Sequence, residues 1–141
     1  MSLNKKYTVL ANDMYNAGQA SSDIKKELKK LNFSKELIKR VSIASYEAEI
    51  NIVIHSLGGV VSFHVGEDRI VYLQFSDNGP GIENIDLAMQ EGYSTASNDA
   101  RNNGFGAGMG LPNIKKATNK MSIISDPNGT ILKLVFYEVG E

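Results

Sequence analysis

The sequence of 141 residues has no cysteine and no tryptophan, and it contains only three prolines and two histidines. The lack of cysteine excludes disulfides, thiolate metal sites and cysteine nucleophiles, and it fits the reducing cytoplasm in which we expect this protein. With His55 and His64 as the only imidazoles, we do not expect a multi-histidine metal site either.

A strong charge of either sign is also missing. Lysine and arginine number 15, aspartate and glutamate 16, and the formal net charge is −1. This balance argues against a strong electrostatic hold on nucleic acid or on an anionic membrane. No apolar run approaches the roughly 18 residues of a membrane span, and no apolar stretch near the start indicates a secretory signal. The length predicts one domain over residues 1–141.

Glycine, by contrast, is abundant and clustered. Seven of the 13 glycines lie between Gly79 and Gly110. Residues 92–110 lack apolar periodicity, and a loop of that length inside a compact domain is usually functional or disordered.

The first half of the chain predicts a strand followed by two helices. Residues 6–11 are β-prone, and apolar residues recur at helical spacing from about residue 17. Ser34 is a plausible N-cap for a second helix over residues 35–55. The apolar stripe of that helix is Leu37, Val41, Ala44, Ala48 and Ile52, and Ile43, Ile50 and Ile54 widen it.

The second half predicts two hairpins. Strands at 60–65 and 69–76 form the first, and strands at 121–125 and 130–139 form the second. Between them we expect a short helix at 84–91 and another that opens at Leu111, with Pro112 in its first turn. Because strands come in hairpin pairs, the fold class is α/β, a two-layer sandwich of a mixed, mostly antiparallel sheet with helices on one face.

Three polar residues follow one ridge of the helix over residues 35–55. Glu47, Asn51 and His55 are spaced i, i+4 and i+8, so they drift by about 40° at each step. They form either the exposed edge of an amphipathic helix or a functional set. In the functional interpretation a carboxylate base lies beside an amide oxygen that can bind Mg²⁺. For His55, at the helix end, a solvated or capping role is the more common one.

Two glycine-rich motifs are the next candidates. Asp77-Asn-Gly79-Pro-Gly81 directly follows an apolar strand, and is either a tight turn or a place where backbone approaches a flat ligand. In the run from Gly104 to Leu111, glycine alternates with other residues before a helix, an arrangement that suits phosphate binding or a disordered loop tip. The Rossmann, P-loop and eukaryotic protein kinase motifs have no match.

In order along the chain, these elements resemble the GHKL (Bergerat-fold) ATP-binding domains. Glu47-x-x-x-Asn51-x-x-x-His55 matches the N box, and Asp77-x-Gly79-x-Gly81 the first glycine box. The second glycine box and the final threonine position are matched by Gly106-x-Gly108-x-Gly110-Leu111 and Gly129-Thr130. Four segments are in addition similar to bacterial anti-sigma-factor serine/threonine kinases of the stress-module switch type: the Gly18-Gln19-Ala20 opening, the N box led by Glu47, Asp77–Ile82 and Glu91–Thr95.

The resemblance implies ATP and Mg²⁺ as cofactors and assigns roles by position. Glu47 would accept the proton of the attacking hydroxyl, and Asn51 would ligate Mg²⁺. Asp77 would accept a hydrogen bond from the adenine amino group, and Thr130 would support the adenine end. The residues implied in nucleotide binding are Asn51, Asp77, Gly79, Gly81, Gly106, Gly108, Gly110, Leu111 and Thr130.

The function implied is an ATP-dependent protein serine/threonine kinase and anti-sigma regulator. Its implied partners are a STAS-domain antagonist, which it would phosphorylate, and a sigma factor or another regulator. The sequence permits a homodimer but does not require one. Two alternatives remain: a non-catalytic module that binds such partners, and the ATP-binding domain of a histidine kinase. The last lacks a free phosphoacceptor, since His55 lies in the proposed N box and His64 in a predicted strand.

Overall fold

The computed structural model describes residues 2–79, 89 and 110–138. The expected helix at 84–91, apart from residue 89, lies outside these residues. So do Gly81, Gly106 and Gly108 and the loop over 92–109.

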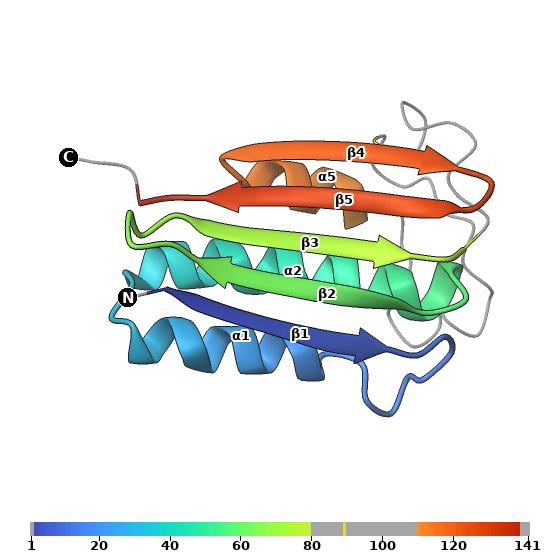
Figure 1. The fold of residues 1–141 in the computed structure, drawn as a ribbon, viewed down its shortest axis with the longest axis horizontal. Helices are drawn as coiled ribbons and strands as arrows, with labels where there is room; N and C mark the ends of the chain where they lie inside the picture. Colours follow the sequence, from blue (N-terminus) through green and yellow to red (C-terminus); the bar gives the residue numbers. More distant parts are fainter. Residues whose placement is uncertain (1, 80–88, 90–109, 139–141) are drawn as a thin grey trace.

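A five-stranded sheet forms one layer of the fold (Figure 1). Its order is β1-β2-β3-β5-β4, and all four strand pairs are antiparallel. Both expected hairpins are therefore confirmed. The strands are β1 (Leu3–Val9), β2 (Gly59–Val65), β3 (Val71–Asp77), β4 (Lys120–Asp126) and β5 (Gly129–Phe136).

The first strand lies about three residues nearer the start than the expected 6–11. The β-prone stretch expected from the sequence did not include Lys5, whose side chain points to the helical layer. The Lys5 Nζ is 2.8 Å from Asp23 Oδ2, so an ion pair provides for a charge at this inward position. The strand ends at Val9 because the chain then turns, with Asn12 at a positive φ of 59° and its N–H bonded to the Val53 carbonyl.

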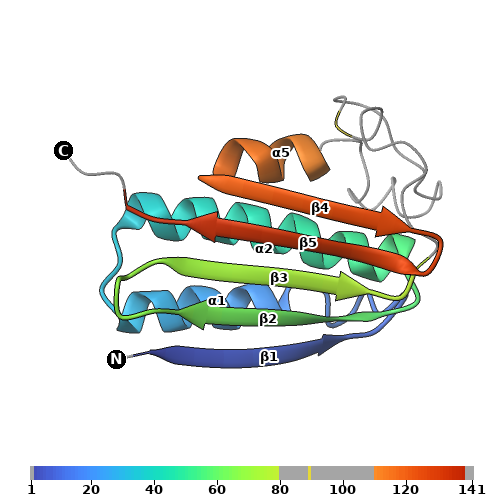
Figure 2. The same cartoon turned by 45° about the horizontal axis from the view of Figure 1, so that its top comes forward.

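Three described helices cover one face of the sheet (Figure 2). They are α1 (Gln19–Lys30), α2 (Lys35–His55) and α5 (Gly110–Ala117), and α2 packs between the other two. The two-layer α/β architecture is thus confirmed. The core lies between the layers and includes Ile24, Phe63, Leu73, Ile114 and Phe136, each at most 2% exposed.

The central helix α2 has the bounds that the sequence predicts. The Ser34 side chain accepts a hydrogen bond from the Leu37 N–H, which confirms the N-cap. The expected stripe from Leu37 to Ile52 is buried, and so is Ile50. The prediction that Ile43 widens this buried stripe is wrong. Its side chain is 41% exposed, because it lies on the side of α2 that turns away from the sheet.

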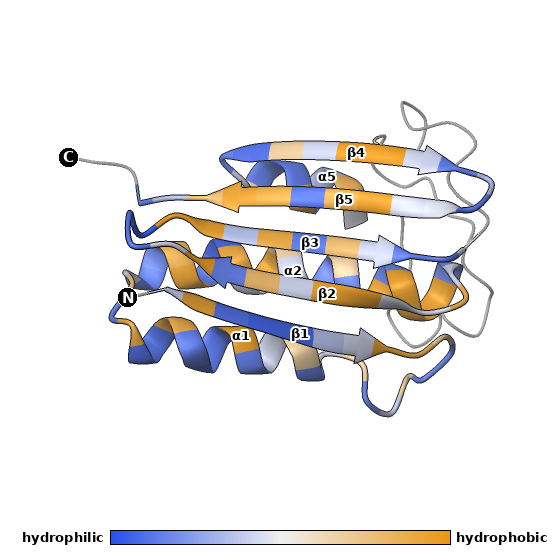
Figure 3. Ribbon diagram, in the orientation of Figure 1, coloured by the Kyte–Doolittle hydropathy of each residue, from blue (hydrophilic) through white to orange (hydrophobic). Residues whose placement is uncertain are grey.

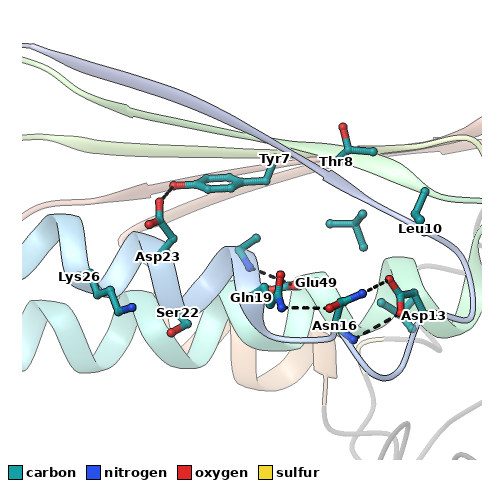
Figure 4. Close-up of a pocket in the computed structure, with 13 residues that line it drawn as sticks. Tyr7, Thr8, Leu10, Asp13, Asn16, Gln19, Ser22, Asp23, Lys26 and Glu49 are labelled. Carbon is teal, nitrogen blue, oxygen red and sulfur yellow. Dashed lines mark hydrogen bonds between the residues drawn. The ribbon is translucent and has the colours of Figure 1, made fainter.

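A buried carboxylate on α2 holds the start of α1. Glu49 is 2% exposed and accepts three backbone hydrogen bonds. The N–H groups of Gly18 and Ala20 donate to Oε2 at 2.9 and 3.3 Å, and that of Ser21 donates to Oε1 at 2.9 Å. Glu49 borders a cavity of about 530 Å³ between β1 and α1, which also contains the Tyr7 hydroxyl bonded to Asp23 (Figure 4).

The helix α1 depends on this carboxylate because it supplies no cap of its own. Its N-cap is Gly18, at a φ of 95°, and its first turn contains no acidic residue. Free N–H groups at a helix start are unsatisfied donors and favour a negative charge. Glu49 supplies that charge from a residue 28 to 31 positions away, and so fixes α2 against α1.

We expect Glu49→Gln to destabilise the protein by about 2–3 kcal/mol, because one acceptor oxygen becomes a donor that faces backbone N–H groups. Urea unfolding followed by circular dichroism measures the loss. The matched control is Glu36→Gln, an exposed carboxylate on the same helix, which should change the unfolding free energy by less than about 0.5 kcal/mol. Equal effects of both substitutions would contradict the clamp.

Candidate functional site

The Asp77 side chain is fixed at the end of β3. The backbone N–H groups of Gly79 and Thr130 donate to its Oδ1 at 2.9 and 3.2 Å. Asp77 is the last residue of the central strand β3, where it pairs with Gly59 on β2 and with Thr130 on β5. No described residue donates to the second oxygen, Oδ2. One carboxylate oxygen is thereby held by the fold, whereas the other has no donor among the described residues.

Two glycines permit this packing around Asp77. A Cβ at Gly129, whose φ is 151°, would lie 2.1 Å from the Asp77 carbonyl oxygen. A Cβ at Gly79 would lie 2.7 Å from the Cα of Ser56, the C-cap of α2. No side chain fits at either distance, so the turn after β3 lies directly against the end of α2. The predicted glycine box therefore has a packing reason at Gly79, independent of any ligand.

A second group of predicted residues lies where α2 meets α5. Glu47 and Asn51 are both partly buried, so neither forms a freely exposed edge. The Asn113 Nδ2 of α5 donates weakly to Glu47 Oε1 at 3.5 Å. A Cβ at Gly110 would lie 3.2 Å from Asn51 Nδ2, so the start of α5 touches the Asn51 amide. Leu111 is 7% exposed and belongs to the core, which makes its predicted nucleotide contact at most a backbone contact.

The helix α2 joins the two groups. Asn51 and Ser56 are five positions apart, a rise of about 7–8 Å along the axis. Glu47 lies about one turn further back. The site is thus elongated, with an amide and a carboxylate at one end and the fixed Asp77 carboxylate at the other.

The donors near Asn51 are compatible with Mg²⁺. An amide oxygen and a carboxylate oxygen, one turn apart on the same helix, are hard ligands of the type this ion prefers. Mg²⁺ normally completes its shell with waters and substrate phosphates, so a few protein oxygens suffice. Among residues 2–79, 89 and 110–138, no cluster of three His, Cys, Asp or Glu side chains forms a metal site.

Two residues at the site were not predicted from the sequence. Ser56 is buried, and its hydroxyl donates to the Ile52 carbonyl at 2.6 Å and accepts from the Gly58 N–H at 3.0 Å. Asn113 contacts Glu47 from α5. The sequence did contain a signal for Asn113, because it lies only three residues after Gly110 of the second glycine box. A helix that starts at a glycine box brings its first turn into the site.

His55 ends α2 and is only partly exposed. Burial lowers the pKa of its imidazole below the ordinary value of 6.5. His64 lies on β2, with its ring nitrogen Nδ1 2.6 Å from Asn4 Oδ1 and its ring against Tyr72. Neither histidine is placed as a freely accessible phosphoacceptor.

Comparison with known proteins places this arrangement in a family. Residues 31–137 match the family of histidine kinase-, DNA gyrase B- and HSP90-like ATPases. The chain belongs to this family. The GHKL resemblance of its motifs is therefore confirmed, and within the matched range lie all of the predicted site residues.

One curated relative is an anti-sigma F factor of Clostridium acetobutylicum, 41% identical over 75 residues. The aligned part covers 50% of this chain and 52% of that relative, so the chain spans about half the length of the relative it matches. This GHKL domain is thus related to an anti-sigma factor.

Solved structures share its fold. The RsbU and RsbW domains of a Mycobacterium tuberculosis protein align over 94% of this chain and 32% of that one, with a TM-score of 0.62 at 17% identity. The SiaB–SiaC complex of Pseudomonas aeruginosa aligns over 94% and 88%, with a TM-score of 0.56 at 12% identity. A histidine kinase domain of Erythrobacter litoralis aligns over 85% and 64%, with a TM-score of 0.52 at 14% identity. At these identities the likeness concerns the fold alone.

No helix in residues 2–79 and 110–138 is both long and apolar enough to span a bilayer.

The partly buried imidazole of His55 predicts a pH dependence of stability. The folded protein takes up this proton at a lower pH than the unfolded chain, whose histidine titrates near 6.5. The unfolding free energy should therefore decrease as the pH falls below about 6.5. Urea unfolding at pH 7.5 and pH 5.5 measures the decrease, which His55→Gln should reduce. An unchanged pH slope in His55→Gln would rule out this residue as the cause.

Proposed function

We propose that the protein is an ATP-dependent protein serine/threonine kinase of the anti-sigma type. It would bind ATP with Mg²⁺ and phosphorylate a STAS-domain antagonist, so that phosphorylation changes which partner that antagonist holds. Membership of the ATPase family supports nucleotide binding, and the similarity to an anti-sigma F factor supports the regulatory role. The same relationship supports a sigma factor or another regulator as a second partner.

The observation that carries the proposal is the fixed carboxylate of Asp77. Two backbone N–H groups hold Oδ1, so the carboxylate is already ordered. Its second oxygen, Oδ2, would accept a hydrogen bond from a ligand without a further loss of side-chain entropy on binding. The exocyclic amino group of adenine is a donor that such an oxygen can accept. An ordered acceptor selects a base with an amino group there over one with a carbonyl, because the latter leaves the carboxylate unpaired.

About two turns before the end of α2, Glu47 would act as the general base. Its partly buried carboxylate is kept near Asn113, and Asn51 is one turn away. In the transfer, the serine or threonine hydroxyl gives its proton to Glu47 while its oxygen forms a bond to the γ-phosphorus. The bond between that phosphorus and the leaving ADP oxygen breaks. Mg²⁺, when bound near Asn51, offsets phosphate charge; Glu47 itself needs only to accept one proton.

Transfer of labelled phosphate from ATP to a STAS-domain protein encoded next to this chain tests the proposal. The unaltered protein should label the STAS protein on serine or threonine. Glu47→Gln should reduce the transfer rate by about 10²–10⁴-fold, the usual contribution of a general base, while ATP still binds. Asn51→Ala should lose transfer as well, because it removes the predicted Mg²⁺ ligand.

The matched control is Glu36→Gln, an exposed carboxylate on the same helix. It should transfer phosphate at the rate of the unaltered protein. Undiminished transfer in both site variants would refute the assigned mechanism. Absence of ATP binding, combined with tight binding to the STAS protein, would instead support a non-catalytic binding module.

A further inference from the structure

The face of the sheet opposite the helices is covered by no described element. In every strand one set of alternate residues packs against α1, α2 and α5, and the other set points away from them. Figure 1 shows this open face toward the viewer, with the helices behind it. The face is independent of the candidate site, since Asp77 belongs to the alternate set that faces the helices.

The open face has a charge pattern that differs from the chain as a whole. Its alternate positions within residues 4–8, 60–64, 72–76, 120–126 and 131–135 contain three lysines and one carboxylate, Asp126 at the end of β4. The lysines are Lys6, Lys120 and Lys133, all exposed. Hydrophilic bands on β1, β3 and β5 are visible on this side in Figure 3. In a chain of net charge −1, this face is locally positive.

The described carboxylates near this face lie at its ends. Asp68, in the turn between β2 and β3, accepts a hydrogen bond from the Ile70 N–H, and Asp126, the last residue of β4, accepts one from the Asn128 N–H. In the described part of the chain none of the three lysines forms an ion pair. Asp126 therefore offsets only part of the positive charge of the open face, and the lysines themselves are unpaired within the described residues.

The lysines are spaced across the sheet. Lys133 lies opposite Ser122, so Lys120 is its diagonal neighbour at roughly 7–8 Å. Lys6 is in the same cross-strand row as Lys133 but three strands away, about 14 Å. Between Lys6 and Lys133 the face has a hollow of about 550 Å³, lined by polar and aromatic side chains such as Gln74 and Tyr72, without a carboxylate.

Apolar side chains lie next to these charges. Ile124 and Ile131 are directly opposite each other on β4 and β5, and they are 61% and 37% exposed. Val60, in the same row on β2, is 39% exposed. Exposed apolar residues gathered beside uncompensated charge are typical of a surface that a partner covers.

We propose that the open face binds an acidic, amphipathic segment of a partner protein. Carboxylates of that segment would pair with Lys6, Lys120 and Lys133, and its apolar side chains would cover Ile124 and Ile131. The bound segment would lie on the side of the sheet opposite Asp77, so that a partner can be held there whether or not nucleotide is bound. This surface goes beyond the proposed kinase activity and does not depend on it.

The chemistry of the face favours a protein over the other polyanions. Three lysines, no arginine and a balanced overall charge do not give the basic stripe that nucleic acid binding requires. A second copy of the chain, placed face to face, would set three lysines against three lysines, with a single aspartate on each face to compensate them. An acidic protein segment, in contrast, satisfies both the charges and the isoleucines.

An array of acidic amphipathic peptides tests the proposal without nucleotide. The peptides combine glutamate and leucine at several spacings, and each has a partner in which every glutamate is lysine. Fluorescence anisotropy should detect binding of members of the acidic set and not of the basic set, with affinity that falls as salt rises from 50 to 500 mM. A carbodiimide, which joins carboxylates to amines, should cross-link bound peptide to Lys120 or Lys133.

The variant with both Lys120→Glu and Lys133→Glu should bind at least tenfold more weakly, and Ile124→Ser should also weaken binding. The matched control combines Lys25→Glu and Lys39→Glu, two exposed lysines of the helical layer, and should change affinity by less than twofold. The proposal is overturned if no acidic peptide binds, or if the control weakens binding as much as the face variant. It is also overturned if the face binds a DNA duplex instead, or if the lysine substitutions dissociate a dimer.

Discussion

A single buried carboxylate fixes the rotation of α2 against the start of α1. Glu49 lies about 200° around the helix from Glu47, so the two acids face opposite flanks. On one flank, Glu49 receives three backbone N–H groups from the start of α1. On the other, Glu47 and Asn51 meet α5 at Asn113 and Gly110. A rotation of α2 that moved the second flank would break the hydrogen bonds of the first, so the clamp also orients the candidate catalytic residues.

The end of α2 transmits this constraint to the sheet. Ser56 caps the helix and leaves no space for a side chain at Gly79, and the Gly79 N–H in turn orients the Asp77 carboxylate. Thr130, from β5, supplies the second donor. The base-binding and phosphate-binding ends of the proposed site are therefore connected through one helix, α2.

Local signals predicted the elements well. The N-cap at Ser34 and the regular apolar spacing after it are properties of neighbouring residues, and they gave α2 its bounds. Lys5 hid the start of β1, because its inward charge is matched only by Asp23 on another element. The contacts that build the site are likewise nonlocal: Asp77 with Thr130, Gly79 with Ser56, and Glu49 with backbone N–H groups. Backbone donors leave no mark in a sequence, so the role of Glu49 was not predictable from it, whereas the family resemblance did single out Asp77 and Thr130.

The central claim is that the fixed carboxylate of Asp77 recognises adenine, and calorimetric titration tests it most directly. ATP with Mg²⁺ should bind the unaltered protein, and GTP should bind at least a hundredfold more weakly because it lacks the amino group at that position. Asp77→Asn, which keeps the shape but loses the charge, should weaken ATP binding strongly, while Asp126→Asn, at an exposed turn, should leave it unchanged. Equal affinity for ATP and GTP, or full affinity in Asp77→Asn, would contradict the account.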